Sequence, residues 1–148
     1  MLLGLLVFMV FLAFLLALWE IQIEGQDGWA AKLPGWRLDK GWVMKLTGGR
    51  PVTGYHLYMT IFLIASVHLP LFFVPWTWRL EFLLIGFYVG MVFLEDFLWF
   101  LLNPFYGLRN FRKGQIWWHK RWWGPVPDLY WILLVLTAIL IYFGRSAI

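Results

Sequence analysis

Four long apolar runs constrain this chain more than any other feature of its sequence. They cover residues 2–19, 55–74, 80–102 and 129–143. A helix needs about 20 apolar residues to cross a hydrocarbon core about 30 Å thick, and the runs lie near that length, the last being a little short. They are continuous rather than alternating, which favours helices over the strands of a barrel. The sequence predicts an all-α integral membrane protein, with a four-transmembrane-helix bundle as a single domain over residues 1–148.

The composition agrees with lipid as the solvent of this chain. Hydrophobic residues make up 62% and charged residues 14% of its 148 residues, against roughly 45–50% and 25% in soluble domains. A soluble domain of this size leaves too many residues at its surface to hide so much apolar area. The chain has no cysteine, which excludes thiolate metal sites and cysteine nucleophiles. A net charge of +4 on so apolar a chain does not indicate a nucleic-acid partner.

The first apolar run resembles a secretory signal peptide only in its position. No basic residue precedes it, no small-x-small cleavage pattern follows it, and it exceeds the apolar core of about 7–15 residues found in signal peptides. We therefore expect residues 2–19 to be retained as the first helix.

Two long loops, residues 20–54 and 103–128, connect the predicted helices, and a short turn connects the middle pair. In a four-helix topology the two long loops share one side of the membrane. They carry ten of the twelve lysines and arginines, and the others are Arg79 and Arg145. Because basic loops are retained in the cytoplasm, we expect both long loops to be cytoplasmic and both termini to be outside, in a bacterial-type inner membrane.

Tryptophan is concentrated in these loops. The first loop contains three Gly-Trp pairs six or seven residues apart, and the second contains the segment IWWHKRWWGPVP. Tryptophan rings and basic side chains are both stable at the depth of lipid headgroups. We expect two interfacial loops on the membrane surface, which act either as an anchor or as the rim of a lipid-facing pocket.

The third run contains two adjacent acidic residues, Glu95 and Asp96. Glu95 precedes Asn103, where the helix is expected to end, by eight residues, or about 12 Å. Neighbouring side chains on a helix point about 100° apart, so the pair cannot face lipid together, and ionisable groups in hydrocarbon are costly. At least one of them should face the interior of the bundle. On the opposite side of this helix, Gly86 and Gly90 would let another helix approach closely.

Further polar residues are expected at the same end of the bundle. Two glutamates follow the first run, one histidine opens the second run and another lies in the second long loop. Carboxylates and imidazoles together suit a zinc, iron or manganese ion, or general acid–base catalysis. The alternatives are interfacial hydrogen bonding by the histidines and a purely structural role for the acidic pair. The candidate catalytic residues are Glu95, Asp96, His56, His119 and Asn103, and the candidate metal ligands are Glu95, Asp96, His56, His119, Glu20 and Glu24.

His68 is expected to lie apart from these residues. It follows His56 by twelve residues, which is about 18 Å along a helix, and points about 120° away. As a cofactor-binding residue it could ligate a haem or a chlorophyll-type metal. The alternative is a hydrogen bond to a neighbouring helix, which the nearby Ser66 and Pro70 favour.

The segment LEDFLWF, residues 94–100, resembles the paired-carboxylate segment of small membrane lycopene cyclases. The likeness covers only these residues, and Leu94 stands where that family has a proline, so the family is not assigned. The leading functional prediction is a small membrane-embedded enzyme whose lipid or isoprenoid-like substrate enters from the bilayer and meets the carboxylate and histidine residues.

A second prediction is non-catalytic: an accessory subunit of a respiratory or photosynthetic membrane complex that binds lipid, pigment or partner helices. A transporter that uses Glu95 as its coupling group is a third possibility, but it would need to dimerise to line a pathway. In each case we expect membrane lipids as partners, together with a partner helix or a second copy of the chain.

Overall fold

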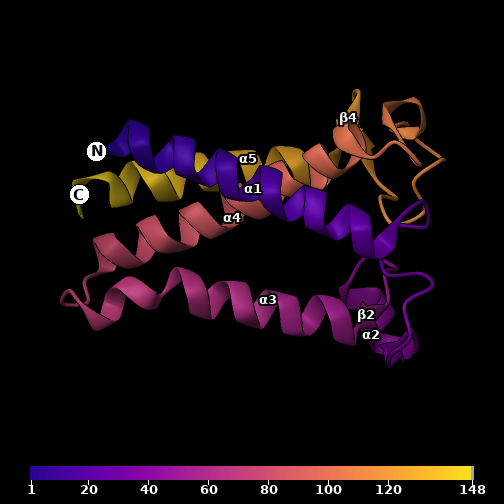
Figure 1. Cartoon of the computed structure of the whole chain (residues 1–148), viewed down its shortest axis with the longest axis horizontal. Helices are drawn as coiled ribbons and strands as arrows, with labels where there is room; N and C mark the ends of the chain where they lie inside the picture. Colours follow the sequence, from indigo (N-terminus) through magenta and orange to yellow (C-terminus); the bar gives the residue numbers. More distant parts are fainter. Residues whose placement is uncertain (148) are drawn as a thin grey trace.

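Four apolar helices form the body of the molecule. The computed structural model describes residues 1–147. The four helices are α1 (Leu2–Glu24), α3 (Gly54–Val67), α4 (Trp78–Leu102) and α5 (Asp128–Gly144). Helix α4 is central, because it contacts each of the other three, and α3 lies along one side of the molecule (Figure 1).

Three helices are long and apolar enough to cross a membrane: α1, α4, and α5 with the 3-10 turn that follows it. The 23 residues of α1 and the 25 residues of α4 extend for about 35 and 38 Å. The 14 residues of α3 extend for only about 21 Å, and the 3-10 helix η1 (Leu69–Phe72) follows them. Length and composition thus support membrane association through α1, α4 and α5.

Helix α1 is longer than the sequence predicted. It continues five residues beyond residue 19 and ends at Gly25, whose φ of 60° stops the helix. Ile21 explains the extension, because it is buried against Trp99 and Phe100 of α4. The extra turn places Glu20 and Glu24 on the helix instead of in the loop.

Helix α3 is shorter than the predicted run, which extended to residue 74. It begins at a cap in which the Thr53 hydroxyl accepts a hydrogen bond from the His56 backbone N–H at 3.2 Å. It ends at Val67 because Pro70 lacks an N–H and its ring would clash with the preceding helical turn. The chain continues through the tighter helix η1 before it reaches α4.

Both long loops gather at the end of the molecule opposite to the two termini (Figure 1). They contain more regular structure than an all-α fold predicts. In each loop two short strands pair antiparallel, β1 with β2 and β3 with β4. The loop elements are β1 (Arg37–Leu38), α2 (Gly41–Leu46), β2 (Val52–Thr53), η2 (Leu108–Asn110), β3 (Trp122–Trp123) and β4 (Val126–Pro127).

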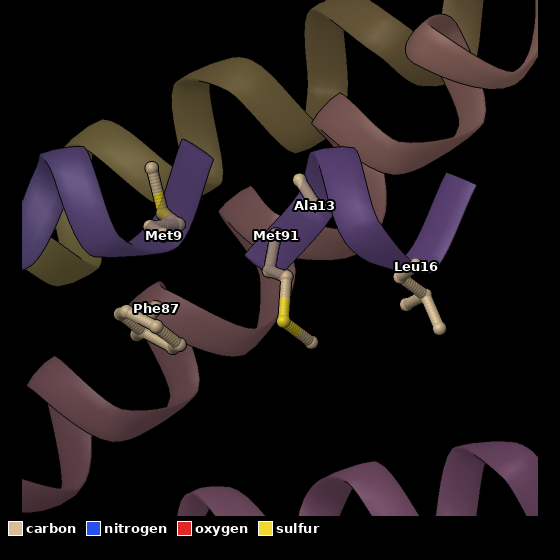
Figure 2. Close-up of a cluster of buried hydrophobic side chains, with 5 residues drawn as sticks. All are labelled: Met9, Ala13, Leu16, Phe87 and Met91. Carbon is tan, nitrogen blue, oxygen red and sulfur yellow. The ribbon is translucent and has the colours of Figure 1, made fainter. Parts of the chain in front are cut away.

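The core between α1 and α4 consists of side chains that α1 and α4 direct at each other (Figure 2). Met9, Ala13 and Leu16 come from α1, and Phe87 and Met91 come from α4. Ala13 is fully buried, and its small side chain lets the two helices lie close together.

Glycines bring α4 and α5 into close contact. A Cβ on Gly86 would lie 2.9 Å from the Leu140 Cβ, and a Cβ on Gly144 would lie 2.5 Å from the Leu83 backbone nitrogen. Gly90 faces Met9 of α1 as well as α5. The predicted close approach of another helix at Gly86 and Gly90 is therefore confirmed.

We predict that Gly144→Ala destabilises the protein by about 1–3 kcal/mol, because the new methyl group overlaps backbone atoms that cannot move independently. Gly4→Ala is the matched control, since nothing lies within 4 Å of a Cβ at that position. Thermal unfolding in detergent measures both variants. Equal unfolding temperatures for the two variants would contradict the close contact between α4 and α5.

Candidate functional site

Two glutamates one turn apart on α1 face a histidine at the start of α3. His56 Nε2 lies 3.8 Å from Glu20 Oε1 and 3.6 Å from Glu24 Oε1. One ligand atom from each of these three residues lies within 4.8 Å of the other two. Ligands that share an ion at about 2.0–2.2 Å lie within about 4.4 Å of each other, so the two measured distances fit a common cation.

The surroundings of His56 hold its ring in one orientation. Its Nδ1 lies 2.7 Å from the Thr53 hydroxyl oxygen, and the ring stacks on Trp29 with 4.4 Å between centroids. In the tautomer whose Nδ1–H donates to Thr53, Nε2 presents its lone pair to the two glutamates. Partners of this kind orient the metal-binding histidines of proteins.

Glu95 faces the same space from α4. The site encloses a cavity of about 70 Å³, which is large enough for an ion with water molecules. Glu95 Oε1 and Trp99 Nε1 are buried and have no hydrogen-bond partner among residues 1–147. Buried polar atoms without partners are rare and costly, so a bound species would stabilise them. The lining residues are Glu20, Glu24, Trp29, His56, Met59, Glu95, Asp96, Trp99 and Trp118.

Asp96 belongs to a second polar group beside this cavity. Its Oδ2 accepts a hydrogen bond from the Tyr130 hydroxyl and lies 3.1 Å from His119 Nε2. The His119 side chain is almost completely buried. A carboxylate that orients an imidazole is an arrangement suited to proton transfer. Because Asp96 also lines the cavity, this pair adjoins the carboxylate cluster.

Asn103 lies near these residues but does not line the cavity. Its amide Nδ2 donates to the Gly25 carbonyl at 2.7 Å, and its Oδ1 accepts from the backbone N–H groups of Phe105 and Tyr106. Asn103 thereby joins the end of α1 to the segment after α4. These contacts describe a structural role.

His68 lies at the opposite end of α3. Its Nε2 is 3.2 Å from Glu81 Oε1 on α4, and its Nδ1 is 2.7 Å from the Ile64 carbonyl. The structure therefore shows the hydrogen bond between helices that was the alternative to cofactor binding. A haem or pigment metal on Nε2 would have to displace Glu81.

Sequence reasoning did not identify Tyr130, Thr53 and Trp29 as parts of the site. Tyr130 had one usable signal, because it lies in the first turn of the last apolar run, at the end where the acidic residues were expected. Thr53 precedes His56 by three residues, which is the spacing of a helix cap. Trp29 had no signal, since its stacking on His56 depends on how the first loop folds back.

Comparison of the chain with protein-family models, with curated proteins and with solved structures gives no match.

We predict that Asp96→Asn loosens the second loop, because His119 and Tyr130 lose a charged partner, and such hydrogen bonds contribute about 1.5–3 kcal/mol each. Trypsin should then cleave faster after Lys120 and Arg121. Asp39→Asn is the control, since it removes one carboxylate from an exposed position. Equal cleavage rates in both variants would show that Asp96 does not hold this loop.

Proposed function

We propose that this protein is a small membrane-embedded enzyme that acts on a lipid or isoprenoid-like substrate at a metal-binding carboxylate–histidine site. One observation carries the proposal: three glutamates and a histidine, Glu20, Glu24, Glu95 and His56, line one small cavity in a largely apolar helical body. Carboxylates brought together away from water repel one another and lose hydration. A divalent cation between them offsets both effects.

The donor set indicates which ions fit. Carboxylate oxygens and one imidazole nitrogen suit zinc, iron or manganese. Glu20, Glu24 and His56 are the proposed ligands, and Glu95 faces the ion from α4. Such an ion supplies Lewis-acid chemistry when bound. His119, oriented by Asp96, is the proposed proton donor or acceptor beside it.

An apolar groove supports a lipid-like substrate. It has a volume of about 370 Å³ and lies between α1, α3 and α4. Its walls include three residues of the core between α1 and α4: Leu12, Phe87 and Met91. Met59 packs against the same core and also lines the carboxylate cavity, so the groove and the cavity are close to each other. A hydrocarbon chain in this groove would direct its polar end toward the carboxylates. The lining residues are Leu5, Phe8, Leu12, Leu63, Ser66, Val67, Leu69, Pro70, Leu83, Leu84, Phe87 and Met91.

The proposed topology is a four-helix bundle in a bacterial-type inner membrane, with the loops in the cytoplasm. Helix α3 together with η1 extends for about 29 Å, close to the thickness of the hydrocarbon core. The distribution of basic residues supports this orientation. The metal site then lies at the cytoplasmic face of the membrane, where substrate from the bilayer meets water.

We predict that protein stripped with a chelator and reloaded with zinc, iron or manganese binds about one ion per chain. His56→Ala and Glu20→Gln should each weaken binding by more than about 100-fold, because each removes a ligand. Elemental analysis of detergent-purified protein measures the bound metal. His68→Ala and Glu81→Gln are the matched controls, since they alter an equivalent pair at the other end of the bundle.

Two results would count against the metal enzyme. One is that folded wild-type protein binds no metal. The other is that the site variants and the control variants lose metal binding to the same extent. Stoichiometric co-purification with other membrane proteins, with no metal bound, would instead support an accessory subunit that binds lipid, pigment or partner helices.

The proposed topology also predicts which positions are accessible from outside the cell. Because the chain contains no cysteine, a single introduced cysteine is the only thiol that can be labelled. Single cysteines at Asp39 and Lys113 should react with a membrane-impermeant maleimide only after permeabilisation of the cells. Single cysteines at Pro75 and Ser146 should react in intact cells, since the short turn and the C-terminus would face outside. Protection of Pro75→Cys in intact cells would show that α3 does not cross the membrane.

A further inference from the structure

A second, open cleft lies beside the carboxylate cavity. It has a volume of about 550 Å³, and its walls come from the end of α2 and the segment after it, from the second loop and from the start of α5. Four basic side chains line it: Lys45, Arg50, Lys120 and Arg121. Asp128 is the acidic residue among its lining residues.

The charges of this cleft do not balance. Arg121 Nε lies 2.9 Å from Asp128 Oδ2, so these two residues neutralise each other. Within the part of the chain that the structure describes, Lys45, Arg50 and Lys120 have no carboxylate at salt-bridge distance. Three cations from two loops far apart in the sequence therefore converge without an ion-pair partner, and their repulsion favours a bound anion.

The fold holds Arg50 in place and leaves room for Lys120. Arg50 Nε donates to the Thr47 carbonyl at 3.1 Å, and its guanidinium lies 5.0 Å from the Trp29 ring centroid. Burial lowers the pKa of Arg50, which reflects the cost of its charge at this position. The Lys120 ammonium occupies the space that a side chain on Gly49 would fill. Guanidinium and ammonium groups both recognise phosphate oxygens.

The surroundings of the cleft favour an amphiphile over a wholly soluble ligand. Trp42, Leu46 and Trp123 are exposed by 71%, 77% and 72% at the same end of the molecule. Large apolar side chains beside basic residues are typical of segments that insert at the headgroup level of a membrane. Trp118 lines both the cleft and the carboxylate cavity, and His119 lines the cleft while it contacts Asp96.

We infer that this cleft binds the phosphate group of a phosphorylated membrane amphiphile through Arg50, Lys120 and Lys45. The phosphate lies next to Trp118 and His119, which places the polar end of the lipid beside the carboxylate site. That this amphiphile is the substrate rests on the proposed function; the phosphate site itself does not.

Titration calorimetry of the full chain in non-ionic detergent tests the inference with three probes. Dihexanoylphosphatidic acid carries the phosphate and short tails, dihexanoylglycerol carries the tails alone, and inorganic phosphate carries no tails. Arg50→Gln/Lys120→Gln should weaken binding of dihexanoylphosphatidic acid by about tenfold or more, because it removes charge-assisted hydrogen bonds. Arg112→Gln/Lys113→Gln removes the same charge from exposed positions outside the cleft and should change binding by no more than about twofold.

The outcomes separate clearly. Stronger binding of dihexanoylphosphatidic acid than of inorganic phosphate, lost only in the cleft variant, supports a lipid phosphate. Equal binding of both, lost in the same variant, supports the phosphate site but assigns it to soluble phosphate compounds. Binding of dihexanoylglycerol as strong as that of dihexanoylphosphatidic acid, or equal losses in the two double variants, would overturn the inference.

The same titration distinguishes failure of this inference from failure of the proposed function. It is repeated with chelator-treated protein and with Glu20→Gln, neither of which alters a residue that lines the cleft. If the protein binds phosphate but never binds metal, the phosphate site in the cleft is supported and the metal enzyme is rejected. Metal binding without phosphate binding would reject the cleft alone.

Discussion

The cost of placing carboxyl groups among hydrocarbon side chains governs this structure. Glu20 and Glu95 are each exposed by only 6%, although they belong to the two longest apolar helices of the chain. Neither faces the outer surface of the bundle, and both face one cavity that also receives His56. Water, a cation or a protein donor must compensate such groups, since an uncompensated charge in this setting would unfold the bundle or become protonated.

Uneven helix packing provides the space for the site. Glycines bring α5 against α4, and Ala13 brings α1 against the same helix, so that these three helices form a tight unit. Helix α3 has none of these close contacts and lies to one side (Figure 1). The apolar groove and the carboxylate cavity both lie where α3 meets this unit. The apolar groove and the buried polar site therefore arise from the same difference in packing.

The two loops close the site because their aromatic residues pack into the end of the bundle. Trp118 stacks on Phe100 of α4, with 5.8 Å between centroids and 14° between ring planes. Gly28 lies against Trp118, and a side chain at position 28 would collide with that ring. The first loop contributes Trp29 and the second contributes Trp118 to the cavity wall. The tryptophans that predicted interfacial loops thus divide into exposed ones, such as Trp42 and Trp123, and those that line the site, the half-buried Trp29 and the buried Trp118.

Three features follow from the order of residues alone: the helical, apolar body, the position of the long loops at one end, and the group of acidic and histidine residues near that end. Apolar run length and helical phase are local properties, so they can be read without knowledge of the fold. The folded chain was needed to show that α1 extends to Glu24, that His56 lies close to two glutamates, and that Asp96 pairs with His119 and Tyr130. The fold also places Asn103 outside the cavity, where its side chain binds the Gly25 carbonyl at the end of α1. These features depend on contacts between segments far apart in the chain, where packing and the pairing of buried polar groups outweigh local preference.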